Sequence, residues 1–233
     1  METSALACLG NIFLEPKKAL QDIRAHGRWL WYPFIISIVL SVILIIWYFS
    51  RVDMNWLGQQ TLAQLSGKNL STDQQQAILG SLTRSRFLTF GIVGAVVVTI
   101  ILWLLQALYY FFAAKIGGYE EQSYGQWFNF TVWTWFPNVV ATIAAGIAYV
   151  FASPQTAFQS IDVTSLNTLL FHLSPYAGLG SVANSVHLTT FWTLGLMVVG
   201  FSLWTKKTLG KSAFIVLAPW VVIYAIWIIV KLV

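Results

Sequence analysis

Residues 87–114 read FLTFGIVGAVVVTIILWLLQALYYFFAA, a stretch of 28 residues without a charged side chain. A hydrocarbon core about 30 Å thick is crossed by roughly 20 apolar residues of helix, so this stretch can span a membrane with tilt. Within lipid, a single segment satisfies its own backbone hydrogen bonds only as a helix. The stretch therefore predicts a transmembrane helix.

Four further apolar stretches of this kind lie along the chain, at about 29–50, 129–152, 186–204 and 213–230. Aromatic residues gather at both ends of the first, as in the aromatic belts of membrane proteins. Over the whole chain 58% of residues are hydrophobic and 9% are charged, whereas soluble proteins average about 25% charged residues. We therefore predict an all-α, polytopic membrane protein with five transmembrane helices, in which residues 1–233 form a single membrane domain.

The segment 11–28 precedes the first predicted span. Its apolar side chains Phe13, Leu20 and Ile23 recur at helical spacing, and charged side chains occupy the rest of the helical wheel. Pro16 suits the first turn of a helix. This pattern predicts an N-terminal interfacial amphipathic helix that lies at the membrane surface.

Two longer connectors separate the spans. Residues 53–86 are polar and favour two short helices, the second with a capping box formed by Ser71 and Gln74. We expect these helices to form a hairpin against the membrane face of the bundle. Residues 153–185 carry one charge, Asp162, and an apolar stretch, which favours a partly buried or interfacial helix over an open loop.

The connector between the second and third spans holds most of the candidate interaction residues, which are Gly117, Gly118, Tyr119, Glu120, Glu121 and Tyr124. The glycine pair should end the second span and permit a tight turn. The two glutamates are the only paired carboxylates in the chain, and neighbouring residues on a helix do not share a face. We interpret them as part of a solvated turn. The alternative is that they form, with the two tyrosines, a docking site for a cytoplasmic partner.

Pro137 and Asn138 lie near the start of the third span. Proline removes a backbone donor and leaves a carbonyl one turn back without its partner. A polar side chain beside the proline can repair this defect or mark a functional kink. The other polar groups expected inside the spans, such as Gln106, more often bond between helices than line a pathway.

The residue types that build catalytic and metal sites are sparse. His26, His172 and His187 stand in no catalytic or metal-binding pattern, and we interpret each as an interfacial histidine. Cys8 is the only cysteine and should be structurally inert, with S-acylation a remote alternative. No block of basic residues resembles a nucleic-acid-binding tail. We therefore expect no enzyme activity, no cofactor and no metal; the expected partners are the lipid bilayer, protein partners or a second copy of the chain, and no nucleic acid.

Positive charge is distributed unevenly over the two sides of the predicted bundle. Eight of the 13 Lys and Arg residues lie on the N-terminal side and five on the other side. The positive-inside rule then predicts a cytoplasmic N-terminus and an outside C-terminus, with 153–185 outside as well. Four basic residues in and next to the connector 53–86 lie on that outside face and weaken this orientation.

Three stretches resemble the Yip1 domain family over almost the whole chain. The sequence FLEPKKALQDIRAHGRWLWYPFIISIVL (13–40) resembles the family's opening, an aromatic-x-x-Pro helix followed by a Trp and Pro entry to the first span. The sequence KIGGYEEQSYGQWFNFTVWTWFPNVV (115–140) resembles the central signature, in which a glycine pair ends the second span and an aromatic third span reaches a proline. Residues 165–226 are similar to the family's amphipathic segment, aromatic-Trp span, basic turn and last span.

The resemblance implies five spans and a cytoplasmic N-terminus. The eukaryotic branch of the family is associated with Rab GTPases and vesicle traffic. This sequence lacks that branch's long cytosolic N-terminal region and its Asp-Leu-Tyr-Gly-Pro signature, so it resembles the short prokaryotic-type members and Rab binding is not transferred.

We therefore expect a non-enzymatic membrane protein of Yip1 type in a prokaryotic cytoplasmic (inner) membrane, acting through membrane or protein interactions, as in the trafficking and membrane organisation of the wider family. The alternative is a small-solute transporter or channel, although no ionisable residue lies inside the predicted spans. A membrane enzyme acting on lipid comes third and would need Glu120 or Glu121 to share a pocket with a histidine. A continuous polar cavity near Gln106 and Asn138 would favour transport, and a dry core with an exposed apolar patch would favour association.

Overall fold

The computed structural model describes residues 4–65, 71–119, 122–174 and 178–232. These residues form helices joined by turns, without a β-strand among them. Glu120 and Glu121 lie outside the described residues. The prediction of an all-α membrane protein is confirmed.

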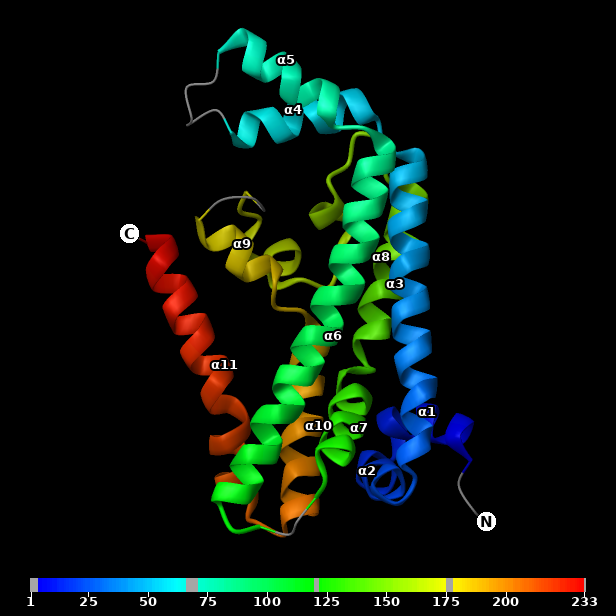
Figure 1. The fold of residues 1–233 in the computed structure, drawn as a ribbon, viewed down its shortest axis with the longest axis vertical. Coiled ribbons are helices and arrows are strands. Elements are labelled where there is room, and N and C mark those ends of the chain that lie inside the picture. Colours follow the sequence, from blue (N-terminus) through cyan, green and yellow to red (C-terminus); the bar gives the residue numbers. More distant parts are fainter. Residues whose placement is uncertain (1–3, 66–70, 120–121, 175–177, 233) are drawn as a thin grey trace.

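Five helices, all longer than the other helical segments, are long and apolar enough to cross a membrane (Figure 1). They are α3 (Trp31–Arg51), α6 (Arg84–Ile116), the pair α7 (Tyr124–Trp135) and α8 (Asn138–Phe151), α10 (Leu188–Thr205) and α11 (Leu209–Leu232). The five apolar stretches predicted from the sequence are thus helical and long enough to cross a membrane. The third span is divided into two helices, because Pro137, the N-cap of α8, cannot donate a backbone hydrogen bond.

The N-terminal region contains two short helices where the sequence predicted one. The first, α1 (Ala5–Leu14), begins at an N-cap whose Ser4 side chain accepts from a backbone N–H, and α2 (Pro16–Ala25) follows directly. Pro16 stands at the first position of α2, as predicted, and therefore also prevents α1 from continuing. A short 3-10 helix, η1 (Gly27–Leu30), leads from α2 into α3.

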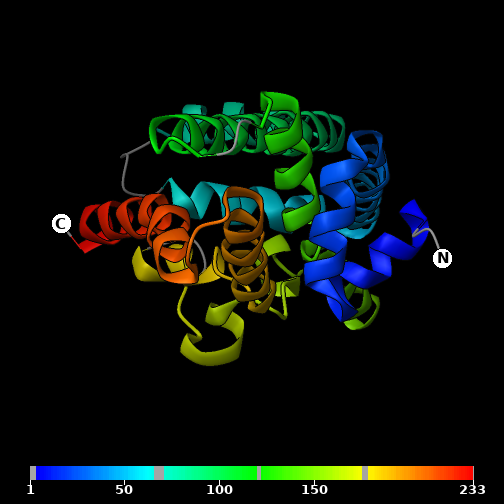
Figure 2. The ribbon, with the colours of Figure 1, turned by 90° about the horizontal axis from the view of Figure 1, so that it is seen from below.

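Helix α2 packs on the protein with the face that the sequence pattern made apolar. Leu20 and Ile23 are fully buried against α7 and α10. The indole of Trp204 donates to the carbonyl of Leu20 over 2.8 Å, and the amide of Asn129 donates to the carbonyl of Ile23 over 2.7 Å. Seen end-on, α1 and α2 lie at the edge of the bundle opposite α11 (Figure 2). The apolar face of α2 is thus covered by protein, whereas the surface-helix interpretation expected it to face lipid.

The two long connectors occupy the other end of the molecule (Figure 1). The first forms α4 (Met54–Gln64) and α5 (Thr72–Ser81), and the capping box of Ser71 and Gln74 is confirmed. The second contains a 3-10 helix, η3 (Phe158–Ile161), one turn of π-helix, η4 (Asn167–Phe171), and α9 (Gly178–Asn184). Helix α9 packs against α11.

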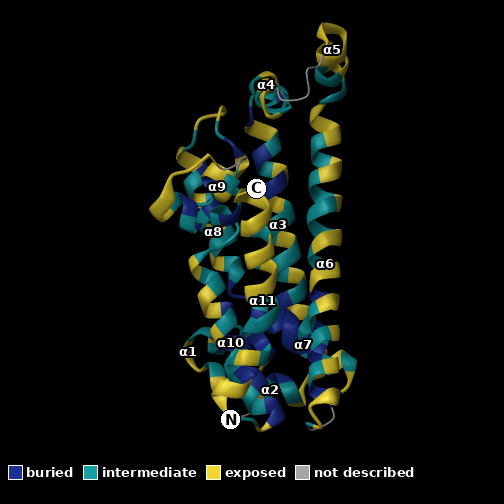
Figure 3. Ribbon diagram, turned by 90° about the vertical axis from the view of Figure 1, so that its left-hand side faces the viewer, coloured by how far each residue is buried: buried dark blue, intermediate teal, exposed yellow. Residues whose placement is uncertain are grey.

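Burial is uneven along the bundle (Figure 3). A core of aromatic side chains fills the end that carries α2, and its fully buried members include Trp127, Trp133, Trp204, Phe130 and Phe201. The outward faces of α6 and α11 expose long runs of Val, Ile, Leu and Phe, as helices in lipid do. Buried side chains fill the end of the bundle that carries α2. The half nearer the two long connectors is packed less densely and contains a cavity.

Candidate functional site

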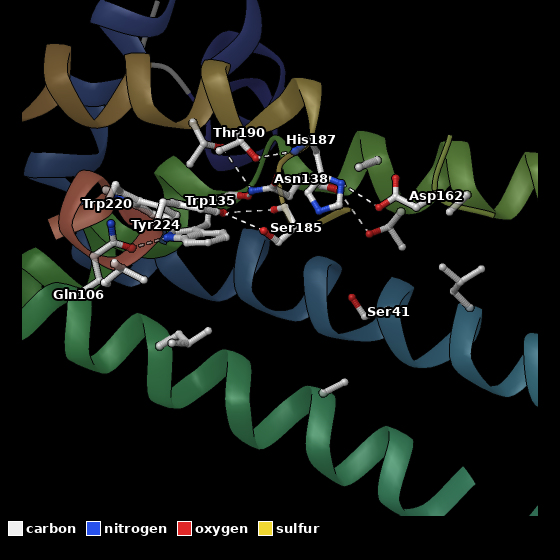
Figure 4. Close-up of a pocket in the computed structure, with 18 of the residues that line it drawn as sticks. Ser41, Gln106, Trp135, Asn138, Asp162, Ser185, His187, Thr190, Trp220 and Tyr224 are labelled. Carbon is white, nitrogen blue, oxygen red and sulfur yellow. Dashed lines mark hydrogen bonds and ion pairs between the residues drawn. The ribbon is translucent and has the colours of Figure 1, made fainter. Parts of the chain in front are cut away.

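A cavity of about 800 Å³ lies in that half of the bundle, lined by residues of α3, α6, α7, α8, α10, α11 and the second connector. Figure 4 shows Gln106 and Trp220 at one end of it and Asp162 at the other. Its volume falls in the range of about 300–1,000 Å³ that is usual for small-molecule pockets. Most of its wall consists of apolar and aromatic side chains.

The floor of the cavity is a hydrogen-bonded cluster around Gln106. The indole of Trp135 donates to the side-chain oxygen of Gln106, whose amide nitrogen donates to the hydroxyl of Tyr110 over 3.0 Å and to the sulfur of Met197. The aromatic core lies directly beyond this cluster, since Tyr110 packs on Trp127. The polar atoms of this cluster are therefore bonded to one another at this end of the cavity.

Asn138 joins the broken third span to α10 beside the cavity. Its amide nitrogen donates to the carbonyl of Trp135 over 3.0 Å and to the hydroxyl of Thr193 over 3.2 Å. Its oxygen accepts from the hydroxyl of Thr189 over 2.7 Å. The side chain thus satisfies the carbonyl of Trp135 at the break between α7 and α8 and connects two helices. The carbonyl that Pro137 leaves without its usual donor, that of Trp133, accepts instead from the N–H of Phe136. The sequence did not predict the two threonine partners.

The opposite end of the cavity holds an acid and a histidine that the sequence did not connect. Nδ1 of His187 lies 2.8 Å from Oδ2 of Asp162, and both side chains are about one quarter exposed. Oδ1 of Asp162 accepts from the N–H and the O–H of Thr164. Burial by itself would raise the pKa of Asp162, but the contact with His187 and the bonds from Thr164 outweigh burial, so the pKa lies below its ordinary value.

The pairing depends on how the second connector folds back. The segments at Ser165 and His187 form an isolated antiparallel bridge, in which Leu166 donates to the carbonyl of Val186 and Leu188 donates to that of Thr164. This bridge places residue 162 beside residue 187. A single charge in an otherwise apolar connector was the available sequence signal, but the bridge that supplies its partner has no local pattern.

Helix α11 closes one side of the cavity and is attached by side-chain hydrogen bonds at two points along its length. Pro219 lies inside α11 and leaves the carbonyl of Ile215 without its usual N–H donor. The hydroxyl of Tyr109 on α6 donates to that carbonyl over 2.6 Å. Nearer the connectors, Ser185 donates from its hydroxyl to the hydroxyl of Tyr224 over 3.2 Å.

Between these two attachments the cavity reaches the outer surface of the bundle. Leu102 and Leu105 of α6 line the cavity, and 50% and 57% of their surfaces are exposed. Ile223 of α11 also lines it and is 60% exposed. These residues mark a lateral edge between α6 and α11, and this edge lies in the apolar, lipid-facing belt.

The glycine pair between the second and third spans behaves as predicted. Gly117 is the C-cap of α6, Gly118 has a φ of 61°, and the N–H groups of Gly118 and Tyr119 donate to the carbonyls of Lys115 and Ala114. This is a Schellman motif, in which glycine adopts the left-handed conformation at little cost.

The neighbouring tyrosines lie at the same end of the bundle, away from the cavity. The ring of Tyr119 stacks under Lys207, with Nζ 4.7 Å from the ring centroid. The hydroxyl of Tyr124 donates to a carbonyl of α6 over 3.2 Å. Because Glu120 and Glu121 lie outside the described residues, a shared docking site of these four residues stays a prediction.

Cys8 lies in the packed core of the protein. Its side chain is fully buried, and burial, with a smaller effect of Asp22, raises the pKa of its thiol to about 12. Within the described ranges, no group of three or more His, Cys, Asp or Glu side chains is placed to hold a metal ion.

Comparison with known proteins adds one positive finding. The model of the Yip1 domain matches residues 10–230, which is nearly the entire chain. No curated protein and no solved structure matches it. An integral membrane protein with five apolar helices and a Yip1 domain over almost its whole length, this chain belongs to the Yip1 domain family.

Proposed function

We propose that this protein is a non-enzymatic membrane protein that binds an apolar molecule of the bilayer in its lateral cavity. The observation that carries the proposal is the cavity of about 800 Å³ with an apolar wall and an edge between α6 and α11. A molecule dissolved in the bilayer can enter there without crossing water. This is a specific form of the membrane interaction that the sequence predicted.

The apolar wall of the cavity favours an apolar occupant. Because the cavity opens at an edge between α6 and α11, whatever surrounds that edge fills it, and hydrocarbon covers the apolar wall more favourably than water does. Water gains little in a cavity whose wall offers few free polar groups. Hydrocarbon from the membrane is the occupant that this wall favours.

The same geometry disfavours the two alternatives. Transport requires a polar path, and the Gln106 cluster and the aromatic core close the cavity at one end. A lipid-acting enzyme built on Glu120 or Glu121 requires a histidine nearby. Among the described residues that line the cavity, the histidine is His187, at the N-terminal end of α10, and no glutamate lines the cavity with it.

We further propose that the N-terminus is cytoplasmic and that the membrane is the prokaryotic inner membrane. Some of the basic residues on the opposite face, which count against this orientation under the positive-inside rule, have a structural role. Arg51, Arg84 and Arg86 donate to carbonyls at the C-terminal ends of α8, α3 and α5. Cations at these positions stabilise helix ends. Their number on this face therefore says less about orientation than the number on the other face. We also propose that a protein partner, or a second copy of the chain, binds to the membrane domain formed by residues 1–233.

Filling the cavity tests the proposed binding. Ala141 lines the cavity, and Ile143 lies on the outer face of the same helix with 47% of its surface exposed. Ala141→Phe should reduce the lipid-like molecules that co-purify with the protein, as counted by native mass spectrometry, at least several-fold, while Ile143→Phe should leave them unchanged. Equal co-purification by both variants, with both folded by circular dichroism, would contradict the proposal.

A further inference from the structure

Helix α1 has one apolar face against the protein and a second apolar face that points outward. Cys8 and Ile12 are fully buried, and the sulfur of Cys8 lies 3.9 Å from the carbonyl oxygen of Ala19 on α2. On the other face, Leu6 is 67% exposed and Leu14 is 82% exposed. The helix contains no charged side chain. Its outer face is therefore stabilised by contact with an apolar environment.

This helix lies where the first span enters the membrane. Helix α1 contacts α3, and Figure 1 shows it beside the end of the bundle at which α3 begins. Trp31 and Tyr32, at the start of α3, are 56% and 44% exposed, as aromatic side chains at the level of the lipid head groups are. Ten residues of helix rise about 15 Å, half the thickness of a hydrocarbon core of about 30 Å. Helix α1 is thus too short to cross the bilayer and has the length of a helix that lies in its surface.

Positive charge lies next to α1 in the chain. Lys17 and Lys18 follow it at the start of α2, and Arg28 lies in η1, which leads into α3. Lys17 and Arg28 are exposed and have no hydrogen-bond or ion-pair partner among the described residues. Lys18 lies 3.6 Å from Glu15, and more than half of each side chain is exposed, so this pair is weak. These cations are available to an anionic partner.

The whole end of the molecule that carries α1 and α2 is basic. Eight Lys and Arg residues lie there, and the carboxylates that the structure describes at this end are Glu15 and Asp22. An apolar helix face beside Lys and Arg is typical of segments that bind an anionic membrane surface. An acidic soluble protein would match the cations only, whereas a bilayer supplies hydrocarbon for the leucines and anionic head groups for the cations.

We infer that the outer face of α1 inserts into the leaflet at this end of the protein, and that Lys17 and Arg28 bind the head groups of its anionic lipids. Helix α1 thereby takes the surface position that the sequence pattern assigned to the segment containing α2. No described residue of α1, α2 or η1 lines the cavity. The inference is therefore independent of the proposed cavity binding.

A fluorophore on the outer face of α1 tests the insertion and the lipid preference together. Gly10 lies on this face, is exposed, and a Cβ there would meet nothing within 4 Å beyond its own helix. Full-length protein with Gly10→Cys and Cys8→Ala is labelled and reconstituted into vesicles of equal parts phosphatidylcholine and phosphatidylglycerol, with bromine on the acyl chains of one lipid or the other. We expect both brominated lipids to quench the fluorescence, and brominated phosphatidylglycerol to quench it about threefold more, because cations near the surface attract anionic lipid. In about 1 M salt, where the Debye length is about 3 Å, the quenching should persist and the preference should disappear.

Variants then connect the preference to the two cations. The double variant Lys17→Gln and Arg28→Gln should be quenched equally by both lipids. The matched control is Lys211→Gln, an exposed lysine in α11 at the opposite edge of the same end (Figure 2), which should leave the preference unchanged. Absence of quenching by either lipid would overturn the inference and leave the outer face of α1 to a protein partner. Equal quenching with both cations present, or a preference that the double variant retains, would also overturn it.

Discussion

The side-chain amide of Asn138 connects the two halves of the third span to each other and to α10. It satisfies the carbonyl of Trp135 at the break between α7 and α8 and bonds to Thr189 and Thr193 on α10. Asn138→Leu should lower the free energy of unfolding by about 1–3 kcal/mol, since interhelical bonds in membranes contribute about 0.6 kcal/mol each and a freed carbonyl adds to the loss.

Thr142→Val is the matched control for this substitution. The hydroxyl of Thr142 bonds to a carbonyl of its own helix, the one at Asn138, over 3.4 Å, so its loss should cost much less. Thermal unfolding in detergent measures both variants. If Asn138→Leu unfolds at the same temperature as Thr142→Val, the cross-helix role of the amide is contradicted.

Asp162 should make stability depend on pH. Its folded-state pKa lies below the unfolded value, so its contribution is present above the unfolded pKa of about 3.9 and is lost as pH falls through the folded-state value. The unfolding temperature should therefore fall on acidification below about pH 4. Asp162→Asn should reduce this fall, and Thr164→Val, which removes one bond to the carboxylate, should reduce it less. An unchanged pH profile in Asp162→Asn would contradict the assignment.

At this scale the sequence predicted single residues better than pairs. Pro16, the Ser71 capping box and the glycine pair follow local rules of helix ends, so they could be predicted. The contact of Asp162 with His187 spans 25 positions and depends on a chain reversal without local signature. The polar end of the cavity could therefore not be predicted.

Among the helices, α11 has the attachment that is most easily tested. Pro219 frees the carbonyl of Ile215, and Tyr109 supplies the missing donor from α6. Tyr109→Phe should leave that carbonyl unbonded and increase backbone hydrogen exchange in α11. Pro219→Ala restores an N–H at position 219, so adding it to Tyr109→Phe should return exchange toward the original rate.

Tyr32→Phe, at an exposed site on α3, is the control for loss of a hydroxyl. If Tyr109→Phe exchanges no faster than this control, the bond between α6 and α11 contributes nothing. Exchange that stays fast in the double variant would show that Tyr109 acts through something other than the carbonyl at Ile215.

Some helices are strongly predicted by the sequence pattern, and others are not. Long charge-free runs specified the five spans, because lipid permits few alternatives to a helix. Helix α1 was missed because a 10-residue apolar segment is too short to be identified as a span. The burial of α2 under Trp204 and Asn129 could not be predicted. An amphipathic pattern shows which face of a helix is apolar, but it does not show whether lipid or protein covers that face.

For the whole molecule, the arrangement of the helices predicts which connectors share a side. Gln76 on α5 and Gln159 in the second connector lie at one end, and Gln21 on α2 and Thr208 before α11 lie at the other. All four are exposed. Single cysteines at these positions, in a Cys8→Ala background, should react with a membrane-impermeant reagent on intact cells only at Gln76 and Gln159. Labelling of Gln21 and Thr208 alone would reverse the orientation, and a mixed pattern would contradict the fold.

The central claim is that hydrocarbon fills the lateral cavity. A spin label at Ala141→Cys, in the same background and in vesicles, reports by electron paramagnetic resonance whether oxygen or a water-soluble nickel chelate collides with it. The account predicts access for oxygen and protection from nickel, as at the outward-facing control Ile143→Cys. Strong collision with nickel at Ala141→Cys would mean a water-filled cavity, which would contradict binding of a membrane molecule and favour transport.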